Sequence, residues 1–138
     1  MSITAGGFPH IVFASPRDPT QEQRNYFRDT LNAAVASLHP GIGSQEDSRI
    51  VDVGSFIDYH ILNLYPKEVD AFIFSAYMYK QRNGLLVMGP IWDYDRTMSP
   101  AEDGRSSNPR SWDAAGTAFF QRSYSWWGHL FDDQPPLG

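Results

Sequence analysis

The chain has 138 residues, 41% of them hydrophobic and 14% aromatic, a formal net charge of −5 and no cysteine. This length buries one modest core, so we expect one small domain or part of a larger one. The acidic balance argues against nucleic acid, which binds basic surfaces. No apolar stretch is long enough to span a bilayer, so no membrane partner is expected. Without cysteine there is neither a disulfide nor a thiolate metal site.

A strand and a helix are the first predicted elements. Residues 9–13 are apolar, contain β-branched side chains and lie between proline and glycine residues, which favours a strand. Thr20 and Gln23 have the spacing of a capping box. Apolar residues then recur at helical spacing, namely Phe27, Leu31, Ala34, Val35 and Leu38. The His-Pro-Gly sequence at 39–41 is expected to end this helix.

A second helix and a hairpin are expected next. The helix begins near Asp52 or Ser55, ends at Pro66 and is apolar enough to lie centrally. Two strand-like runs follow at 76–80 and 85–88. The intervening Gln-Arg-Asn-Gly contains the Asn-Gly pair typical of tight turns, which predicts a β-hairpin.

The last part of the chain is predicted to be a loop and a helix. Residues 96–116 are mostly Gly, Ser, Pro, Asn and charged residues, as in a long loop. Residues 117–133 place aromatic side chains at helical spacing, which predicts a helix with a broad aromatic face. We expect such a face to pack against a partner surface.

Four oxygen-bearing residues on either side of the hairpin suggest phosphoryl transfer. Asp70 is followed five residues later by Ser75, and the hairpin then leads to Asp93 and Asp95. Phosphoryl transfer needs a carboxylate to accept the hydroxyl proton and oxygen ligands that hold Mg²⁺ against the phosphates. In this hypothesis Asp70 is the base, Ser75 takes the place of an amide ligand, and Asp93 binds the metal with help from Asp95.

The spacing alone also allows a structural interpretation. Asp70 could cap a turn after the helix, while Asp93 and Asp95 satisfy backbone donors in a loop. Similarly, Trp92 either shapes a nucleotide pocket or anchors the core next to a turn. The residue pattern does not decide between these alternatives.

The sequence resembles the CotH kinase family, a kinase-like family first known from bacterial spore-coat assembly. The resemblance covers most of the chain and lies in ordered segments: Ile-Val-Asp-Val-Gly-Ser-Phe-Ile-Asp-Tyr at 50–59, Val-Asp-Ala-Phe at 69–72, Ser-Ala-Tyr-Met-Tyr-Lys at 75–80, and Gly-Pro-Ile-Trp-Asp-Tyr-Asp at 89–95. It implies that Asp70 is the catalytic-loop aspartate and Asp93 the metal-binding aspartate, with Mg²⁺ and ATP as cofactors.

Glu68 departs from the family pattern, and the chain is shorter than family members. Family members often carry Asn where this chain has Glu68, and Asn or Ser at the position of Ser75. They also have an N-terminal lobe that supplies basic residues to the nucleotide phosphates. We therefore expect residues 1–138 to be a partial domain with its core at 8–95. The expected fold is α+β, a partial protein-kinase-like large lobe whose helices pack around a small β-hairpin.

The function implied by the resemblance is ATP- and Mg²⁺-dependent phosphorylation of Ser or Thr in a protein substrate. The alternative is a non-catalytic kinase-like module for interaction or assembly in a spore-coat or cell-surface system. A third hypothesis is an attachment module in a secreted polymer-degrading system. A spore-coat or extracellular location rests on the resemblance alone. A partial lobe would expose apolar surface, which self-association or a partner chain would cover.

Overall fold

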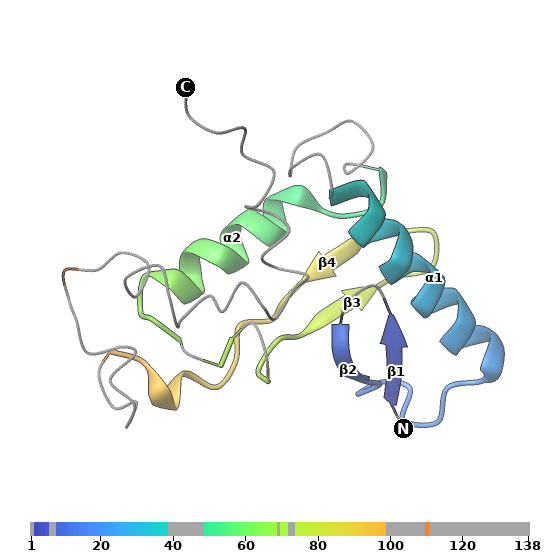
Figure 1. Ribbon diagram of the computed structural model, residues 1–138, viewed down its shortest axis with the longest axis horizontal. Coiled ribbons are helices and arrows are strands. Elements are labelled where there is room, and N and C mark those ends of the chain that lie inside the picture. Colours follow the sequence, from blue (N-terminus) through green and yellow to red (C-terminus); the bar gives the residue numbers. More distant parts are fainter. Residues whose placement is uncertain are drawn as a thin grey trace. The chain divides into compact units, whose positions relative to one another are not determined.

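The computed structural model describes residues 2–5, 8–38, 49–68, 70–71, 74–98 and 110. In chain order the elements are β1 (Ser2–Ala5), β2 (Phe8–Val12), α1 (Gln21–Leu38), α2 (Val53–Leu64), β3 (Met78–Lys80), β4 (Leu86–Met88) and the short 3₁₀ helix η2 (Tyr94–Arg96) (Figure 1). The described residues fall into two compact units, and the chain passes from the first to the second between Ile50 and Val51. These elements confirm the expected α+β class.

The first unit contains β1, β2 and α1. The two strands pair antiparallel, with Ile3 opposite Ile11, and β2 confirms the strand expected at 9–13. Strand β1 was not predicted. The capping box of α1 is present as expected: the Thr20 N–H donates to Gln23 Oε1 at 2.8 Å, and the Gln23 N–H donates to Thr20 Oγ1 at 3.2 Å.

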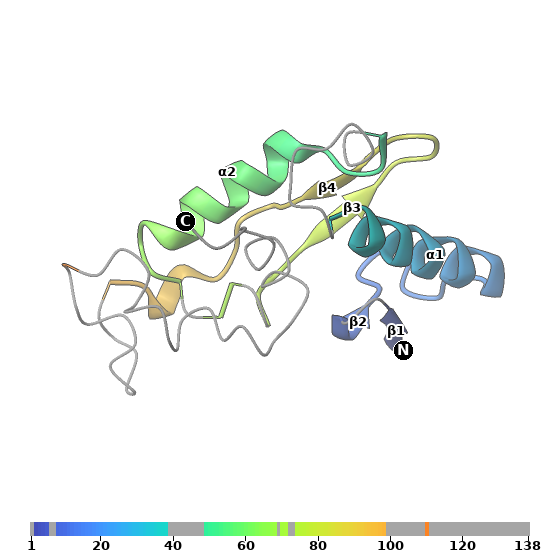
Figure 2. The same ribbon diagram turned by 45° about the horizontal axis from the view of Figure 1, so that its top comes forward.

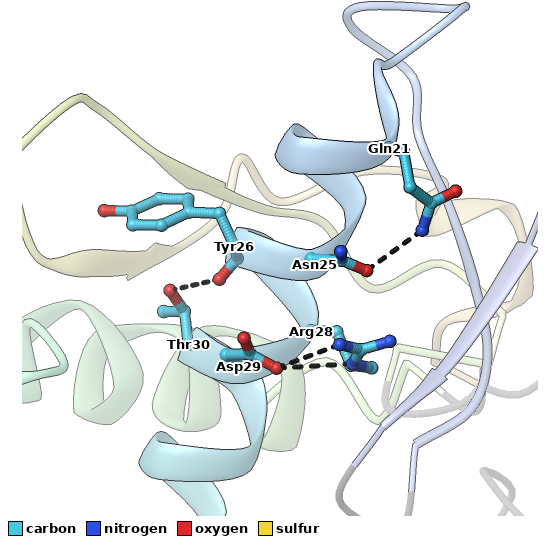
Figure 3. A network of polar contacts seen from close by, with 6 residues as sticks. All are labelled: Gln21, Asn25, Tyr26, Arg28, Asp29 and Thr30. Carbon is cyan, nitrogen blue, oxygen red and sulfur yellow. Dashed lines mark hydrogen bonds and ion pairs between the residues drawn. The ribbon is translucent and has the colours of Figure 1, made fainter.

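Helix α1 has one buried face and one polar face. Leu31 and Ala34 are buried, at the helical spacing that predicted them. On the polar face, shown in Figure 3, side chains contact one another along the helix: Gln21 Nε2 donates to Asn25 Oδ1 at 2.9 Å, and Arg28 pairs with Asp29 at 3.3 Å. Exposed contacts of this kind contribute little to stability, so this face is ordinary solvated surface.

Helix α2 begins where the sequence predicted. Asp52 is its N-cap, and Asp52 Oδ1 accepts the Ser55 N–H at 3.0 Å. The buried side chains of the helix are Phe56, Tyr59, Asn63 and Leu64, at helical spacing. The helix is less central than its composition suggested, because Ile57, Ile61 and Leu62 are about half exposed. A shallow apolar hollow of about 380 Å³ lies at its C-terminal end, lined by His60, Ile61, Leu62, Leu64, Tyr65 and Pro66.

The predicted β-hairpin is confirmed. Strands β3 and β4 pair antiparallel with Tyr79 opposite Val87, and the Gly84 N–H donates to the Gln81 carbonyl across the turn. The hairpin runs alongside α2 in both Figure 1 and Figure 2. Leu86 is buried and its carbonyl accepts the Asp52 N–H at 2.8 Å. The hairpin and the start of α2 are therefore joined through both backbone and core.

The remaining sequence predictions concern residues that the structure describes only in part. Of the loop expected at 96–116, residues 96–98 and 110 are described, and the helix expected at 117–133 lies outside the described residues. Among the described residues, no helix combines the length and the apolar character needed to cross a membrane.

Candidate functional site

The segment after α2 forms a tight turn that carries Asp70 and Ser75. The Asp70 carbonyl accepts the backbone N–H groups of Phe74 at 2.9 Å and Ser75 at 3.0 Å. The buried Tyr59 hydroxyl lies 2.7 Å from the Ala71 carbonyl and 3.2 Å from the Ser75 carbonyl, so that α2 holds both sides of this turn. These backbone hydrogen bonds therefore hold Asp70 and Ser75, which are five residues apart in the sequence, in one turn.

The segment after β4 brings a second aspartate to the same place. Gly89 has φ +118°, a conformation that favours glycine, and its N–H donates to the Tyr77 carbonyl at 2.9 Å. The chain then reaches Asp93, whose φ of 67° and ψ of 55° are left-handed. Non-glycine residues adopt this conformation at a cost, and such residues cluster at functional sites.

Tyr94 ties this second segment to the end of α2. Its hydroxyl lies 3.0 Å from both the Leu62 carbonyl and Asn63 Oδ1. Asn63 is itself buried, and its Nδ2 donates to the Tyr59 carbonyl at 2.7 Å. The position of the Asp93 turn is thus set by the same part of α2 that holds the Asp70 turn.

Two side-chain contacts join the turns directly. Ser75 Oγ donates to Asp93 Oδ2 at 3.2 Å, and Arg96 Nη1 donates to Asp70 Oδ2 at 2.9 Å. The structure therefore brings Asp70, Ser75 and Asp93 into one site. We name this site, with Glu68, Asp95 and Arg96, the acidic site.

Glu68 lies fully buried at the acidic site. Its Oε1 accepts the Asp70 N–H at 3.0 Å, while Oε2 is buried without a hydrogen-bond partner among the described residues. Burial raises the pKa of Glu68, and the charges of Asp70, Asp95 and Asp93 raise it further, whereas the hydrogen bond from the Asp70 backbone acts in the opposite direction. Glu68 is therefore near enough to each of the three aspartates for their charges to affect it.

Trp92 and Asp95 are the other two residues that the sequence singled out. Trp92 is 58% exposed and meets Tyr77 edge to face, with ring centroids 6.1 Å apart, so it is not a core anchor. Asp95 is exposed on η2. Both side chains are accessible to a ligand.

Sequence reasoning gave no role to Glu68 and did not consider Arg96. Glu68 entered only as a departure from the family pattern, although a carboxylate two residues before Asp70 could have indicated an additional charge at the site. Arg96 belongs to the expected loop, and nothing in its sequence context predicts an ion pair with a residue 26 positions away.

The oxygen ligands that Mg²⁺ prefers are present in part. Among the described residues, no three His, Cys, Asp or Glu side chains are grouped so that they could hold a metal ion. However, Mg²⁺ sites commonly use only one or two carboxylates, with water and substrate phosphates completing the shell. The contact between Ser75 and Asp93 brings two oxygen atoms together and fits a site of this kind.

Comparison with known proteins identifies the family. No curated protein and no solved structure matches the chain significantly. The family described as CotH kinase protein does match, over residues 14–135. This range contains both turns of the acidic site and covers most of the sequence. The chain therefore belongs to the CotH kinase family and is a kinase-like domain.

Proposed function

We propose that this domain binds ATP with Mg²⁺ and transfers the γ-phosphoryl group to a Ser or Thr hydroxyl of a protein substrate. Membership of a kinase family points to nucleotide use in general. The observation that carries the proposal is the pairing of Ser75 with Asp93 and of Arg96 with Asp70, which places the two aspartates of the motif at one site.

Four residues of the acidic site have a role in this proposal. Asp70 accepts the proton of the substrate hydroxyl while the hydroxyl oxygen forms a bond to the γ-phosphorus of ATP. The bond between the γ-phosphorus and the bridging oxygen breaks, and that oxygen leaves with ADP. Asp93 and Ser75 would hold the metal, with Asp95 as a further carboxylate. When bound, Mg²⁺ would neutralise charge on the phosphate oxygens.

Trp92 is proposed as a nucleotide contact. Its indole is more than half exposed on the segment that leads from β4 to Asp93. Tyr77 supports it from one side through the edge-to-face contact. A supported, exposed aromatic ring next to the metal-binding residues offers a surface on which a base can stack.

The second candidate is a non-catalytic kinase-like module. The observation that favours it is chemical: Ser75 is a weaker metal ligand than an amide or a carboxylate, and Glu68 adds buried negative charge where the family often has Asn. Such a module would keep the two turns as structure, without binding nucleotide.

Titration of MgATP into the purified chain separates the two candidates. We expect the wild-type chain to bind MgATP and Asp93→Asn to bind it at least about tenfold more weakly, because one metal carboxylate is lost. Asp70→Asn should retain binding but lower kcat for phosphoryl transfer by about a hundredfold to ten-thousandfold, because the general base is lost. Asp58→Asn removes the same charge from an exposed position of α2 and serves as the control. Absence of binding in every variant would favour the non-catalytic module.

A further inference from the structure

Arg96 forms an ion pair with the residue that we propose as the catalytic base. It is the last residue of η2, three positions after Asp93, and its Nη1 lies 2.9 Å from Asp70 Oδ2. The Arg96 side chain is 38% exposed, and the Asp70 side chain is 18% exposed. A partly exposed ion pair contributes little to folding stability. The ion pair is therefore considered for the position that it gives the Asp70 side chain, and not for its contribution to stability.

The other contacts of Asp70 show what this ion pair completes. The Asp70 N–H donates to Glu68 Oε1, and the Asp70 carbonyl accepts two backbone N–H groups from Phe74 and Ser75. Both the N–H and the carbonyl of Asp70 are thus held by hydrogen bonds, independently of its side chain. Arg96 then fixes Oδ2, and no hydrogen-bond donor to Oδ1 is present among the described residues. Within the part of the chain that the structure describes, Arg96 thus orients one carboxylate oxygen of Asp70, and the other accepts no hydrogen bond.

We propose that Arg96 is a positioning residue for Asp70, an inference that rests on the proposed function. A general base must lie within hydrogen-bond reach of the proton that it accepts, in a fixed direction. The guanidinium holds Oδ2 of Asp70 and so presents Oδ1 to the substrate hydroxyl. Since Arg96 and Asp93 belong to the same turn, the pair also sets the base relative to the proposed metal-binding aspartate.

The chemistry of arginine suits this role better than that of lysine. Its guanidinium is planar, always charged and offers donors in a rigid arrangement, so a carboxylate bound to it takes a defined orientation. A lysine ammonium at the same position would keep the charge but would orient the carboxylate less strictly. The Arg96→Lys variant is therefore expected to retain part of the function that a neutral side chain loses.

The test compares Arg96→Gln and Arg96→Lys with the wild-type chain. Three quantities are measured: kcat for phosphoryl transfer from ATP, the Kd for MgATP, and the free energy of unfolding. Arg96→Gln should lower kcat by about tenfold to a hundredfold, as expected for a misplaced base, with Kd changed by less than about twofold. Arg96→Lys should recover part of kcat. Arg82→Gln, which removes a charge from the exposed hairpin turn, should behave as wild type.

A double mutant shows whether Arg96 acts through Asp70. If it does, adding Arg96→Gln to Asp70→Asn should cause no further loss of kcat, because residues that act as a unit are not additive. Wild-type kcat in Arg96→Gln, or a further loss in the double mutant, would overturn the inference while leaving the proposed function intact. A wild-type chain that neither binds MgATP nor transfers phosphate would instead contradict the proposed function, and the role of Arg96 with it.

Discussion

Ser75 Oγ and Asp93 Oδ2 lie 3.2 Å apart although 18 residues separate them in the chain. The buried Ser75 comes from the turn after α2, and the exposed Asp93 from the segment after β4. Each segment is held to α2 independently, the first by Tyr59 and the second by Tyr94. The contact between the two oxygens is therefore a consequence of how both segments are anchored.

This contact predicts how substitutions of Ser75 change cation-dependent nucleotide binding. Ser75→Ala removes one oxygen ligand and should weaken MgATP binding by about threefold to tenfold, the effect of one hydrogen-bonding group. Ser75→Asn supplies the amide oxygen that family members often have and should bind at least as tightly as wild type. Calorimetric titration measures both affinities, with the free energy of unfolding recorded for each variant. Equal affinities in all three chains would show that Ser75 is not a ligand.

Glu68 predicts a pH-dependent loss of stability. Because burial and the charges of Asp70, Asp95 and Asp93 raise its pKa in the folded chain, the folded state holds a proton that the unfolded state releases near the ordinary value of 4.5. The free energy of unfolding contributed by Glu68 is thus fully present below that pH and is lost as the pH rises through the raised folded pKa. At a pH above the raised pKa of the folded chain, the wild type has a negatively charged Glu68 in a buried position.

Glu68→Gln should remove this dependence. The amide oxygen can still accept the Asp70 N–H, while the buried charge disappears. We expect the variant to be more stable than wild type by about 1–2 kcal/mol at high pH, with the difference vanishing under acidic conditions. Denaturant unfolding over a pH series measures the difference, and Glu22→Gln on the exposed first turn of α1 is the control. A difference that stays constant with pH would contradict the assignment.

The elements that the sequence predicted are those with local chemical signals. Thr20 and Gln23 define the start of α1, Asp52 caps α2, and Asn-Gly marks the turn between β3 and β4. Strand β1 was missed because Ser2–Ala5 has only four residues, and its identity as a strand depends on pairing with β2. Local propensity cannot predict an element that exists through its partner.

The acidic site likewise has a part that the sequence predicted and a part that it could not predict. Asp70 and Asp93 were named from a motif, and the structure brings them together through Ser75 and Arg96. The burial of Glu68 and the ion pair of Arg96 could not be predicted, because each depends on contacts between segments that are distant in sequence. Side-chain burial and ion pairing at such distances are properties of packing rather than of spacing.

Tyr94 predicts an effect on both binding and stability. Tyr94→Phe removes the hydroxyl that lies between the Leu62 carbonyl and Asn63 Oδ1. We expect a loss of about 1 kcal/mol in the free energy of unfolding and a MgATP affinity up to about fivefold lower, because the Asp93 turn loses its anchor. Tyr79→Phe, on the half-exposed face of β3, is the matched control. Unchanged affinity with reduced stability would limit Tyr94 to a structural role.

Substitution of Tyr59 is expected to change the free energy of unfolding more than the affinity for MgATP. Burial raises the pKa of its hydroxyl, which therefore stays protonated and donates within the turn that carries Asp70 and Ser75. Tyr59→Phe leaves buried carbonyls without that donor and should lower the free energy of unfolding by about 1–3 kcal/mol. Tyr65→Phe, which follows α2 and is 70% exposed, should change it by less than about 0.5 kcal/mol. Denaturant unfolding compares the two variants, and equal losses would mean that the buried hydroxyl does not hold the turn.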